Sequence, residues 1–302
     1  MWMIPNATHL HCYCAHLPGL ITHDAPGDIQ HILLQLPKGM HYIEGQSISV
    51  IPPGVAENGK KHKPRLYSIA STRYGDALDS ETVSLCVRRA VYVDPSTGME
   101  DASKKGVCSN FLCDSATGTE IEVAGPVGKT MLLPQDAGDK DWAKKDLIMV
   151  ATGTGIAPFR GFLRRLFLEN TVSRHLYQGT AWLILGVPTS GSLLYQDEWN
   201  AILNDQQQGK NSGKFRATYA ISREQTNASG GKMYVQDVLS QHADELFHKL
   251  LNEGAVMYFC GLKGMMPGII EALEKVATAR GLVWDDVMKQ LKNNGQWHVE
   301  VY

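Results

Sequence analysis

Long apolar runs, dense cysteines and a net basic charge are all missing from this sequence, and each absence excludes a class of protein. No apolar run approaches the roughly 20 residues that a membrane span needs, and no signal peptide is visible at Met1. The six cysteines lack the pattern of a small disulfide-bonded domain, so free thiols in a reducing compartment are expected. The formal net charge of −2 gives no global basic field, so we expect no nucleic-acid partner.

A crowded N-terminal segment raises the question of a metal site. Alternating histidine and cysteine side chains fall on one face of a strand, and no second cluster of ligands follows. We therefore favour an ordinary strand here and expect no bound metal. The residues concerned are His9, His11, Cys12, Cys14 and His16.

The first part of the chain has the rhythm of an antiparallel barrel. Short strand-like runs alternate with turns rich in proline and glycine, and evenly spaced short strands are typical of such barrels. The predicted strands include residues 29–36, 47–51, 83–93 and 120–123.

From Asp146 onward the rhythm changes to alternating strands and helices. Continuous apolar runs at 147–151, 181–185, 215–221 and 256–260 predict buried parallel strands, with helices expected at 158–168, 195–204, 235–251 and 267–280. This pattern predicts a doubly wound parallel sheet. With 302 residues and 43% hydrophobic composition the chain can form two domains. We place them at 1–142 and 143–302, joined by a polar linker at 135–145.

A glycine turn follows the first of these buried strands, in the segment Ala151-Thr-Gly-Thr-Gly-Ile-Ala-Pro158. Gly153 and Gly155 let the backbone approach a ligand closely, and Pro158 suits the first turn of a helix. The free amides at such a helix start form a phosphate site. Pro158 stands where the third glycine of the full dinucleotide fingerprint would be, so a plain tight turn stays open as the alternative.

Two segments of the barrel half carry residue types that suit a flat, phosphorylated ligand. In Arg65-Leu-Tyr-Ser68 the arginine can grip a pyrophosphate, the tyrosine can cover a flat ring, and the serine can donate a hydrogen bond to a ring nitrogen. The alternative is a half-buried strand with an incidental arginine. Gly106-Val-Cys-Ser109 begins a predicted helix, which Ser109 either caps or uses to bind phosphate.

These motifs and five others occur in order along the chain. The others are Leu85-Cys-Val-Arg88, Ser222-Arg-Glu-Gln225, Gly231-Lys-Met-Tyr234, Cys260-Gly-Leu-Lys-Gly264 and Trp297-His-Val-Glu-Val-Tyr302. Together they resemble the plant-type ferredoxin–NADP reductases over residues 29–302. The segment from Arg88 to Pro95 and the ending Glu300-Val-Tyr302 are more similar to the root-type and algal plastid forms than to the leaf form.

The resemblance implies a flavin enzyme with an FAD-binding barrel, an NADP-binding parallel sheet and a plastid stromal location, with the transit segment absent from this chain. It would pass hydride between NADP(H) and FAD and single electrons between FAD and ferredoxin, an acidic iron–sulfur protein. Flavodoxin is a second partner that the resemblance allows, and peripheral membrane association is compatible with it.

The resemblance also assigns site residues. Tyr67 would cover one flavin face and Ser68 would bond near the reactive flavin nitrogen. The residues implied to bind FAD are Arg65, Leu66, Tyr67, Ser68, Cys86, Val87, Arg88, Tyr92, Val107, Cys108 and Ser109. Those implied to line the NADP cleft are Thr154, Val187, Pro188, Gly261 and Leu262, with Ser222, Arg223, Lys232 and Tyr234 on the 2′-phosphate. Ser68, Cys260, Glu300 and Tyr302 would form the site where hydride moves, with Glu300 and Tyr302 also contacting the cofactors.

The residue types agree with two of these assignments. A 2′-phosphate needs cations and hydroxyls, and two charge-assisted bonds of roughly 1.5–3 kcal/mol each favour NADP over NAD by on the order of 10² to 10⁴. Cys260 ends an apolar strand, where ligands bind in open parallel sheets, although a buried structural thiol is the usual fate of such a cysteine. We propose no thiolate nucleophile, because flavin supplies the redox chemistry.

Local basic runs have two interpretations, a solvated surface or a docking face for an acidic partner. The candidates are Lys60, Lys61, Lys63, Arg89, Lys104 and Lys105.

Two rival functions also stay open. One is another flavin reductase of the same superfamily, such as a cytochrome reductase or a diflavin reductase fragment. The other is a flavin-binding scaffold without turnover.

The chain ends in a segment that alternates like a strand. Trp297, Val299 and Val301 are predicted to share one face, and His298, Glu300 and Tyr302 the other. A terminal aromatic residue often means little, because chain ends fray. The resemblance implies instead that Tyr302 stacks on the flavin face opposite Tyr67, where nicotinamide must displace it.

Overall fold

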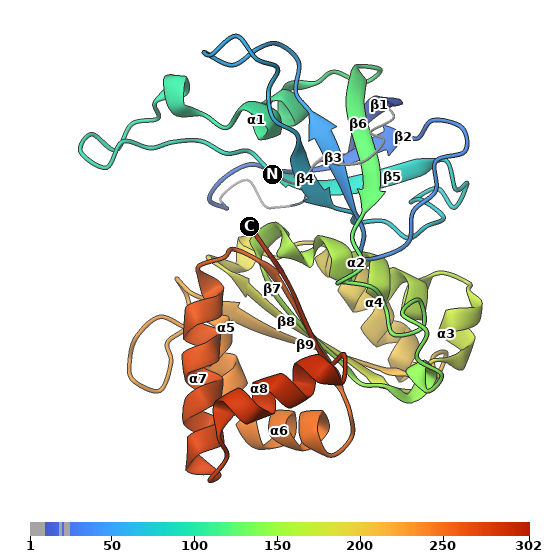
Figure 1. The fold of residues 1–302 in the computed structure, drawn as a ribbon, viewed down its shortest axis with the longest axis vertical. Coiled ribbons are helices and arrows are strands. Elements are labelled where there is room, and N and C mark those ends of the chain that lie inside the picture. Colours follow the sequence, from blue (N-terminus) through green and yellow to red (C-terminus); the bar gives the residue numbers. More distant parts are fainter. Residues whose placement is uncertain (1–9, 18–19, 21–24) are drawn as a thin grey trace.

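The computed structural model describes residues 10–17, 20 and 25–302. Two bodies lie one above the other, a sheet-rich half formed by the first part of the chain and a helix-rich half formed by the rest (Figure 1). None of the helices in the described residues is long and apolar enough to cross a membrane. The predicted combination of an N-terminal barrel with a C-terminal α/β domain is confirmed.

The N-terminal half is a six-stranded antiparallel barrel. Its strands run in the order β4-β3-β6-β1-β2-β5. A hydrogen bond from Ala70 N to Ser84 O, beside an isolated bridge between Ile69 and Leu85, closes β4 onto β5. The strands are β1 (Leu10–Leu17), β2 (Ile29–Gln35), β3 (Ser47–Ile51), β4 (Arg65–Ser68), β5 (Thr82–Arg88) and β6 (Glu120–Val127). The strand predicted from His11 to His16 is therefore present as part of β1, while His9 lies outside the described residues.

Period-two alternation forms the barrel core. Inward side chains on the strands, such as Ile32, Ile48, Leu85 and Val123, are buried together. Helix α1 (Val107–Asp114) contributes Cys108 and Leu112 to the same cluster. The predicted strand at 83–93 is too long, because β5 pairs with β2 only as far as Arg88 opposite Ile29. Beyond that point the chain leaves the barrel as an arm, which returns through a bridge between Val93 and Glu100.

The C-terminal half is a five-stranded parallel sheet in the order β11-β10-β7-β8-β9. Its strands are β7 (Leu147–Thr152), β8 (Thr180–Val187), β9 (Lys214–Ile221), β10 (Val256–Gly261) and β11 (Trp297–Val301). Successive residues of β7 enter different apolar clusters, Met149 on one face and Ile148 on the other, so both faces are covered. The strand order reverses between β7 and β10, and ligands bind at such a switch point in open α/β sheets.

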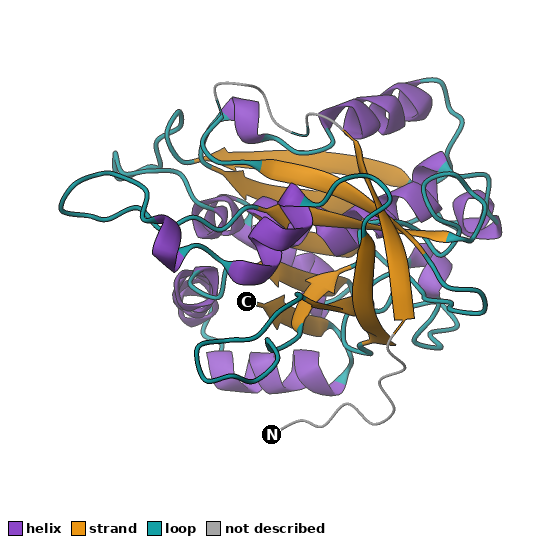
Figure 2. Cartoon of the chain, turned by 90° about the horizontal axis from the view of Figure 1, so that it is seen from above, coloured by secondary structure: helices purple, strands orange, loops and turns teal. Residues whose placement is uncertain are grey.

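Helices cover both faces of this sheet (Figure 2). Packed with one face are α2 (Ala157–Leu163), the π-helical turn Arg164–Leu168 and α4 (Gln196–Gln207), and with the other α5 (Val235–Gln241), α6 (Ala243–Leu251), α7 (Met265–Ala279) and α8 (Trp284–Asn293). The single helix predicted at 235–251 is wrong, because His242 leaves helical geometry with φ −109° and ψ 22°. The prediction also missed α8 and the short α3 (Val172–Leu176).

The predicted linker at 135–145 is firmly held. Asp136 pairs with Arg73 of the barrel half and with Arg165 of the π-helical turn. A 3₁₀ turn, Trp142–Lys144, then leads into β7 across the predicted boundary at residue 142. The precise domain limits stay a prediction.

Candidate functional site

One carboxylate joins the two halves of the molecule. Glu300, on β11, accepts hydrogen bonds at Oε1 from Ser47 Oγ at 2.7 Å and from Ser68 Oγ at 3.1 Å. Cys260 lies beside Glu300 in the parallel register of β10 and β11, and its Sγ is 4.0 Å from Ser68 Oγ. Three of the four residues predicted at the hydride site are thus in contact, although Ser68 comes from the barrel and the other two from the sheet.

Cys260 is fully buried at the carboxyl end of β10. Burial, and then the negative charge of Glu300, raise the pKa of its thiol to about 12. The thiol therefore stays protonated and neutral at physiological pH. This agrees with a role in shaping the site and not in nucleophilic attack.

The fourth predicted residue, Tyr302, is held beside the carboxyl ends of β7 and β10. Its backbone N donates to Gly261 O at 3.0 Å, and its carbonyl accepts from Lys263 N at 2.9 Å. Its phenol OH lies 2.6 Å from Thr154 Oγ1, while 59% of the residue is exposed. The last residue of the chain is therefore not frayed, and its ring remains accessible between the glycine turn and the end of β10.

The glycine turn after β7 is shaped by its close approach to β10. A Cβ at Gly155 would lie 2.1 Å from Cys260 O, so only glycine fits there. Gly153 has φ +52° and open space around it. The sequence interpretation gave both glycines the role of approaching a ligand, but Gly155 makes room for a neighbouring strand. Pro158 falls in the first turn of α2, as predicted.

The predicted FAD segment on β4 presents its first two residues to solvent. Arg65 is exposed, and its guanidinium donates from Nη1 to the carbonyls of Lys63 and Pro64, each at 3.2 Å. Leu66 is also exposed, whereas Tyr67 packs against the barrel core and contacts Cys108. The pKa of Tyr67 is raised, first by burial and then by the neighbouring thiol.

The remaining predicted FAD residues divide into two groups. Cys86, Val87 and Cys108 are buried, so they can offer mainly backbone atoms to a ligand. Exposed side chains are found at Arg88, Tyr92 and Val107.

Ser109 does not cap α1. The N-cap is Gly106, and Ser109 is the third residue of the helix. Its Oγ accepts from Ala90 N at 3.1 Å, which fixes α1 to the base of the arm. The capping alternative for Ser109 is therefore wrong.

Four of the predicted NADP residues meet where β8 and β9 end. Ser222 N donates to Val187 O at 3.0 Å, and Arg223 N donates to Pro188 O at 2.9 Å. A short hairpin after β9 carries Lys232 through its bridge to Thr226. In the part of the chain that the structure describes, no ion pair occupies the exposed side chains of Arg223 and Lys232, so both cations are available to a ligand.

The exposed apolar surface fits the two proposed cofactors. Six of the residues predicted to bind FAD or NADP are large apolar side chains that stay exposed: Leu66, Tyr92, Val107, Tyr234, Leu262 and Tyr302. These side chains are open to contact with a ligand. Flat aromatic ligands with phosphate groups would cover such rings and reach the nearby cations, so the residues present fit FAD and NADP.

Sequence reasoning missed two hydroxyls at this site. Ser47 is the register partner of Ser68 across β3 and β4, so the signal is a hairpin pairing that the sequence alone did not fix. Thr152 ends β7, and its Oγ1 accepts from Leu262 N at 3.0 Å. This bond fixes the turn that holds Tyr302, and only the strand order brings its two partners together.

Curated relatives decide the family. The root-type ferredoxin–NADP reductase of Nicotiana tabacum is 55% identical over 287 residues, covering 94% of this chain and 72% of the relative. The chloroplastic enzyme of Chlamydomonas reinhardtii is 54% identical over 281 residues, covering 92% and 76%. This chain belongs to the ferredoxin–NADP reductase family. The predicted likeness to root-type and algal plastid forms is confirmed.

A family match and a comparison with solved structures agree with this family assignment. The family described as oxidoreductase NAD-binding domain matches residues 149–271. The ferredoxin–NADP⁺ reductase of Plasmodium falciparum has a TM-score of 0.71 at 25% identity, with 100% of this chain and 98% of that chain covered. The same enzyme with 2′P-AMP has a TM-score of 0.72 at 25% identity, covering 98% and 99%.

Proposed function

We propose that this protein transfers electrons between NADP(H) and ferredoxin through a bound FAD. The observation that carries the proposal is the contact of Ser68 with Glu300 and Cys260, which joins the predicted FAD surface of the barrel to the predicted NADP crevice of the sheet. FAD, when bound, supplies the conversion between a two-electron donor and a one-electron partner. The same site serves both directions of electron flow.

The barrel would hold FAD through β4, the end of β5 and the start of α1. Arg65 would bind the pyrophosphate, Tyr67 would cover one face of the flavin, and Tyr92 on the arm offers a second aromatic surface. Lys104 Nζ already lies 4.7 Å from the centre of the Tyr92 ring. Ser68, which donates to Glu300 in the structure, would place its hydroxyl at the flavin edge.

The sheet would hold NADP(H) across the switch point between β7 and β10. Arg223, Lys232, Ser222 and Tyr234 would bind the 2′-phosphate, and the turn from Gly261 to Leu262 would receive the nicotinamide end. Tyr302 would cover the nicotinamide position until the coenzyme displaces it. Glu300 accepts hydrogen bonds from Ser47 and Ser68 at one oxygen, so it is placed to orient nicotinamide and to relay a proton through Ser68.

Ferredoxin docking would use cations that the protein itself leaves unpaired. Arg89 is committed to Asp28 at 2.8 Å and Asp114 at 2.6 Å, and Lys104 pairs with Asp101 at 3.0 Å. Within the described residues no ion pair reaches Lys60, Lys63 or Lys105.

We therefore expect these three lysines to contribute more to docking than Arg89. Steered association weakens as salt rises, so ferredoxin-dependent turnover should fall with ionic strength where association limits the rate. Flavodoxin would use the same face. The plastid location of the relatives supports a stromal site of action.

NADPH-driven bleaching of the bound flavin tests the proposal against the flavin-binding scaffold. FAD-loaded protein mixed anaerobically with NADPH should lose its yellow absorbance, because hydride transfer reduces the flavin. NADH at the same concentration is the control and should bleach far more slowly. Persistent yellow colour with NADPH would contradict the proposed function and favour a flavin-binding scaffold without turnover.

A further inference from the structure

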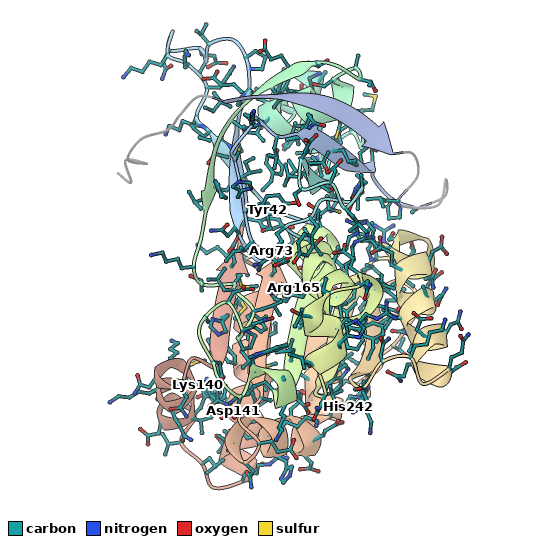
Figure 3. The ribbon with its side chains drawn as sticks, turned by 90° about the vertical axis from the view of Figure 1, so that its right-hand side faces the viewer. Tyr42, Arg73, Lys140, Asp141, Arg165 and His242 are labelled. Atoms are coloured by element: carbon teal, nitrogen blue, oxygen red, sulfur yellow. The ribbon has the colours of Figure 1, made fainter. Side chains whose placement is uncertain are left out.

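A buried set of charges fastens the sheet domain to the barrel. Arg160 of α2, together with Arg164 and Arg165 of the π-helical turn that follows, points into the junction. In Figure 3, Tyr42 and Arg73 of the barrel half lie close to Arg165 there. Both Arg160 and Arg165 reach the barrel half, Arg160 through Asp76 at 2.9 Å and Arg165 through Glu44. Glu44, fully buried, binds Arg165 and Arg73, each at 2.8 Å.

Arg160 is only 4% exposed, and its guanidinium binds three separate segments of the chain. Nη1 donates to Ala70 O at 3.0 Å and to Asp76 Oδ1 at 2.9 Å, both in the barrel half. Nε and Nη2 donate to Glu198 of α4, at 3.1 Å and 2.6 Å. A planar guanidinium can bridge such a set, whereas an ammonium offers one point charge.

The two ends of this bridge lie next to the segments that are predicted to hold FAD and NADP(H). On the barrel side, Ala70 is two residues beyond Ser68 and donates its N–H to Ser84 O at 2.7 Å, at the seam that closes the barrel. On the sheet side, α2 follows directly after the glycine turn that carries Thr154. Arg160 therefore ties the strand that carries Ser68 to the turn beneath Tyr302 through one side chain.

The guanidinium also lies over Tyr195, 4.7 Å from the ring centre. The Tyr195 OH lies 3.0 Å from His31 Nδ1, and His31 in turn bonds Asp76 at 2.7 Å. Asp76 is thus bound by Arg160 and by His31, and Tyr195 in turn contacts both of these residues. Such a set leaves Arg160 little freedom to shift relative to β5 and β4.

We propose that Arg160 is a positioning residue for hydride transfer, which sets the separation of the flavin strand and the nicotinamide pocket. The contact between Glu44 and Arg165 already joins the domains, so Arg160 is not needed merely to keep them together. Its distinct feature is its place between Ser68 and the glycine turn. A misplacement of about 1 Å in a reacting pair can cost on the order of 10²-fold in rate. This inference rests on the proposed function.

The test compares Arg160→Lys with the matched control Arg174→Lys. Arg174 is also a part-buried fork, bound to Asp205, Asn211 and Leu168 O, but all its partners lie in the sheet domain. For each FAD-loaded protein we would measure Tm, flavin occupancy, affinity for 2′-phospho-AMP, and single-turnover flavin bleaching by saturating NADPH. 2′-Phospho-AMP reports the phosphate pocket without requiring the domains to be in register.

We expect bleaching by Arg160→Lys to be about 10-fold or more slower than wild type, with unchanged 2′-phospho-AMP affinity and flavin occupancy. Arg174→Lys should bleach at the wild-type rate even where its Tm falls. A wild-type rate for folded, flavin-loaded Arg160→Lys would overturn the inference. Absence of bleaching in the wild type would instead contradict the proposed function.

A second variant keeps the test decisive if Arg160→Lys does not fold. Glu198 accepts from Arg160 at both oxygens, and Glu198→Gln leaves only one of them as an acceptor. We expect Glu198→Gln to slow bleaching in the same direction but by less. Wild-type bleaching by this variant, where Arg160→Lys cannot be measured, would overturn the positioning role.

Discussion

The barrel and the parallel sheet present their predicted ligand surfaces in different ways. On the barrel, exposed side chains of β4 and the arm, such as Arg65, Leu66 and Tyr92, form the surface. At the edge of the sheet, the glycine turn owes its shape to backbone packing, with Gly155 against Cys260 O. We therefore expect side-chain identity to decide ligand recognition in the barrel, whereas backbone approach decides the geometry at the turn.

Beyond the glycine turn, charged side chains again form the predicted ligand surface of the sheet domain. Arg223 and Lys232 stand beyond the turn, on segments that follow β9. In the proposed function the sheet domain thus separates a turn near the nicotinamide end of the coenzyme from a pair of cations that would select its 2′-phosphate. Changes to the turn should act on folding and geometry, while changes to the pocket should act on binding alone.

Gly155→Ala should have the largest effect, because its Cβ would meet backbone atoms of β10 at 2.1 Å, 2.4 Å and 2.6 Å. We expect a loss of several kcal/mol, on the order of 3 or more, in the free energy of unfolding. Gly153→Ala is the matched control in the same turn. It meets no atom within 4 Å, so only the positive φ penalises it, by roughly 1–2 kcal/mol. Equal losses in urea unfolding would show that the close approach to β10 is not the constraint.

Arg223→Ala combined with Lys232→Ala should erode the preference for NADPH over NADH by on the order of 10² to 10⁴. The effect should be mainly on KM, since a phosphate remote from the reacting carbon is bound alike in the ground and transition states. Steady-state kinetics with both coenzymes checks this. An unchanged ratio of kcat/KM values would remove both residues from the pocket.

Ser68→Val and Glu300→Leu should each slow hydride transfer, by roughly 10²-fold, while FAD stays bound. Ser68→Val removes the hydroxyl that donates to Glu300 at 3.1 Å, and Glu300→Leu removes the acceptor of both serines. Stopped-flow bleaching with NADPH measures the effect, and flavin absorbance after dilution measures retention. Wild-type rates in both variants would mean that these roles are misassigned.

Tyr302→Ser should bind NADP⁺ more tightly, by up to about tenfold, because a stacked aromatic pair of roughly 0.5–1.5 kcal/mol no longer competes with nicotinamide. Turnover with NADPH should fall, since product leaves slowly. Tyr302→Phe keeps the ring and loses only the contact with Thr154, so it should stay near wild type. Titrations in which Tyr302→Ser binds NADP⁺ no better than wild type would place the tyrosine away from the nicotinamide position.

Asp76 gives the smallest effect and a defined pH window. Burial alone would raise the pKa of Asp76, but the hydrogen bond from His31 and the charge of Arg160 outweigh it and hold the pKa well below 3.8. Its ionised form therefore stabilises the fold above about pH 4, and that contribution is lost as pH falls toward the folded-state pKa.

Asp76→Asn should consequently be less stable than wild type near pH 7, with the difference shrinking below about pH 4. Thermal unfolding followed by circular dichroism across this range measures the difference. A gap in Tm that stays constant down to about pH 2.5 would show that the charge of Asp76 is not what stabilises the junction.

Local patterns predicted the strands and most helices, since alternation and apolar runs are local properties. The same local signal placed Ser222 and Arg223 directly after a predicted strand, at residues 215–221. The bond from Ser47 to Glu300 could not be predicted in this way, because it joins residues 253 apart through barrel closure and domain packing. No local pattern singles out Arg160, because only the domain junction brings it to its barrel partners Ala70 and Asp76. The break at His242 also depends on tertiary packing, in which its ring meets Trp182 at 5.1 Å.

Ferredoxin-dependent reduction of cytochrome c by NADPH tests the central claim most directly. The purified, FAD-loaded protein is mixed with NADPH and cytochrome c at low ionic strength, with and without a plant-type ferredoxin. We predict slow reduction without ferredoxin and a large increase when it is added, because single electrons then leave through the iron–sulfur partner. A rate indifferent to ferredoxin, in protein whose flavin is bleached by NADPH, would contradict the account.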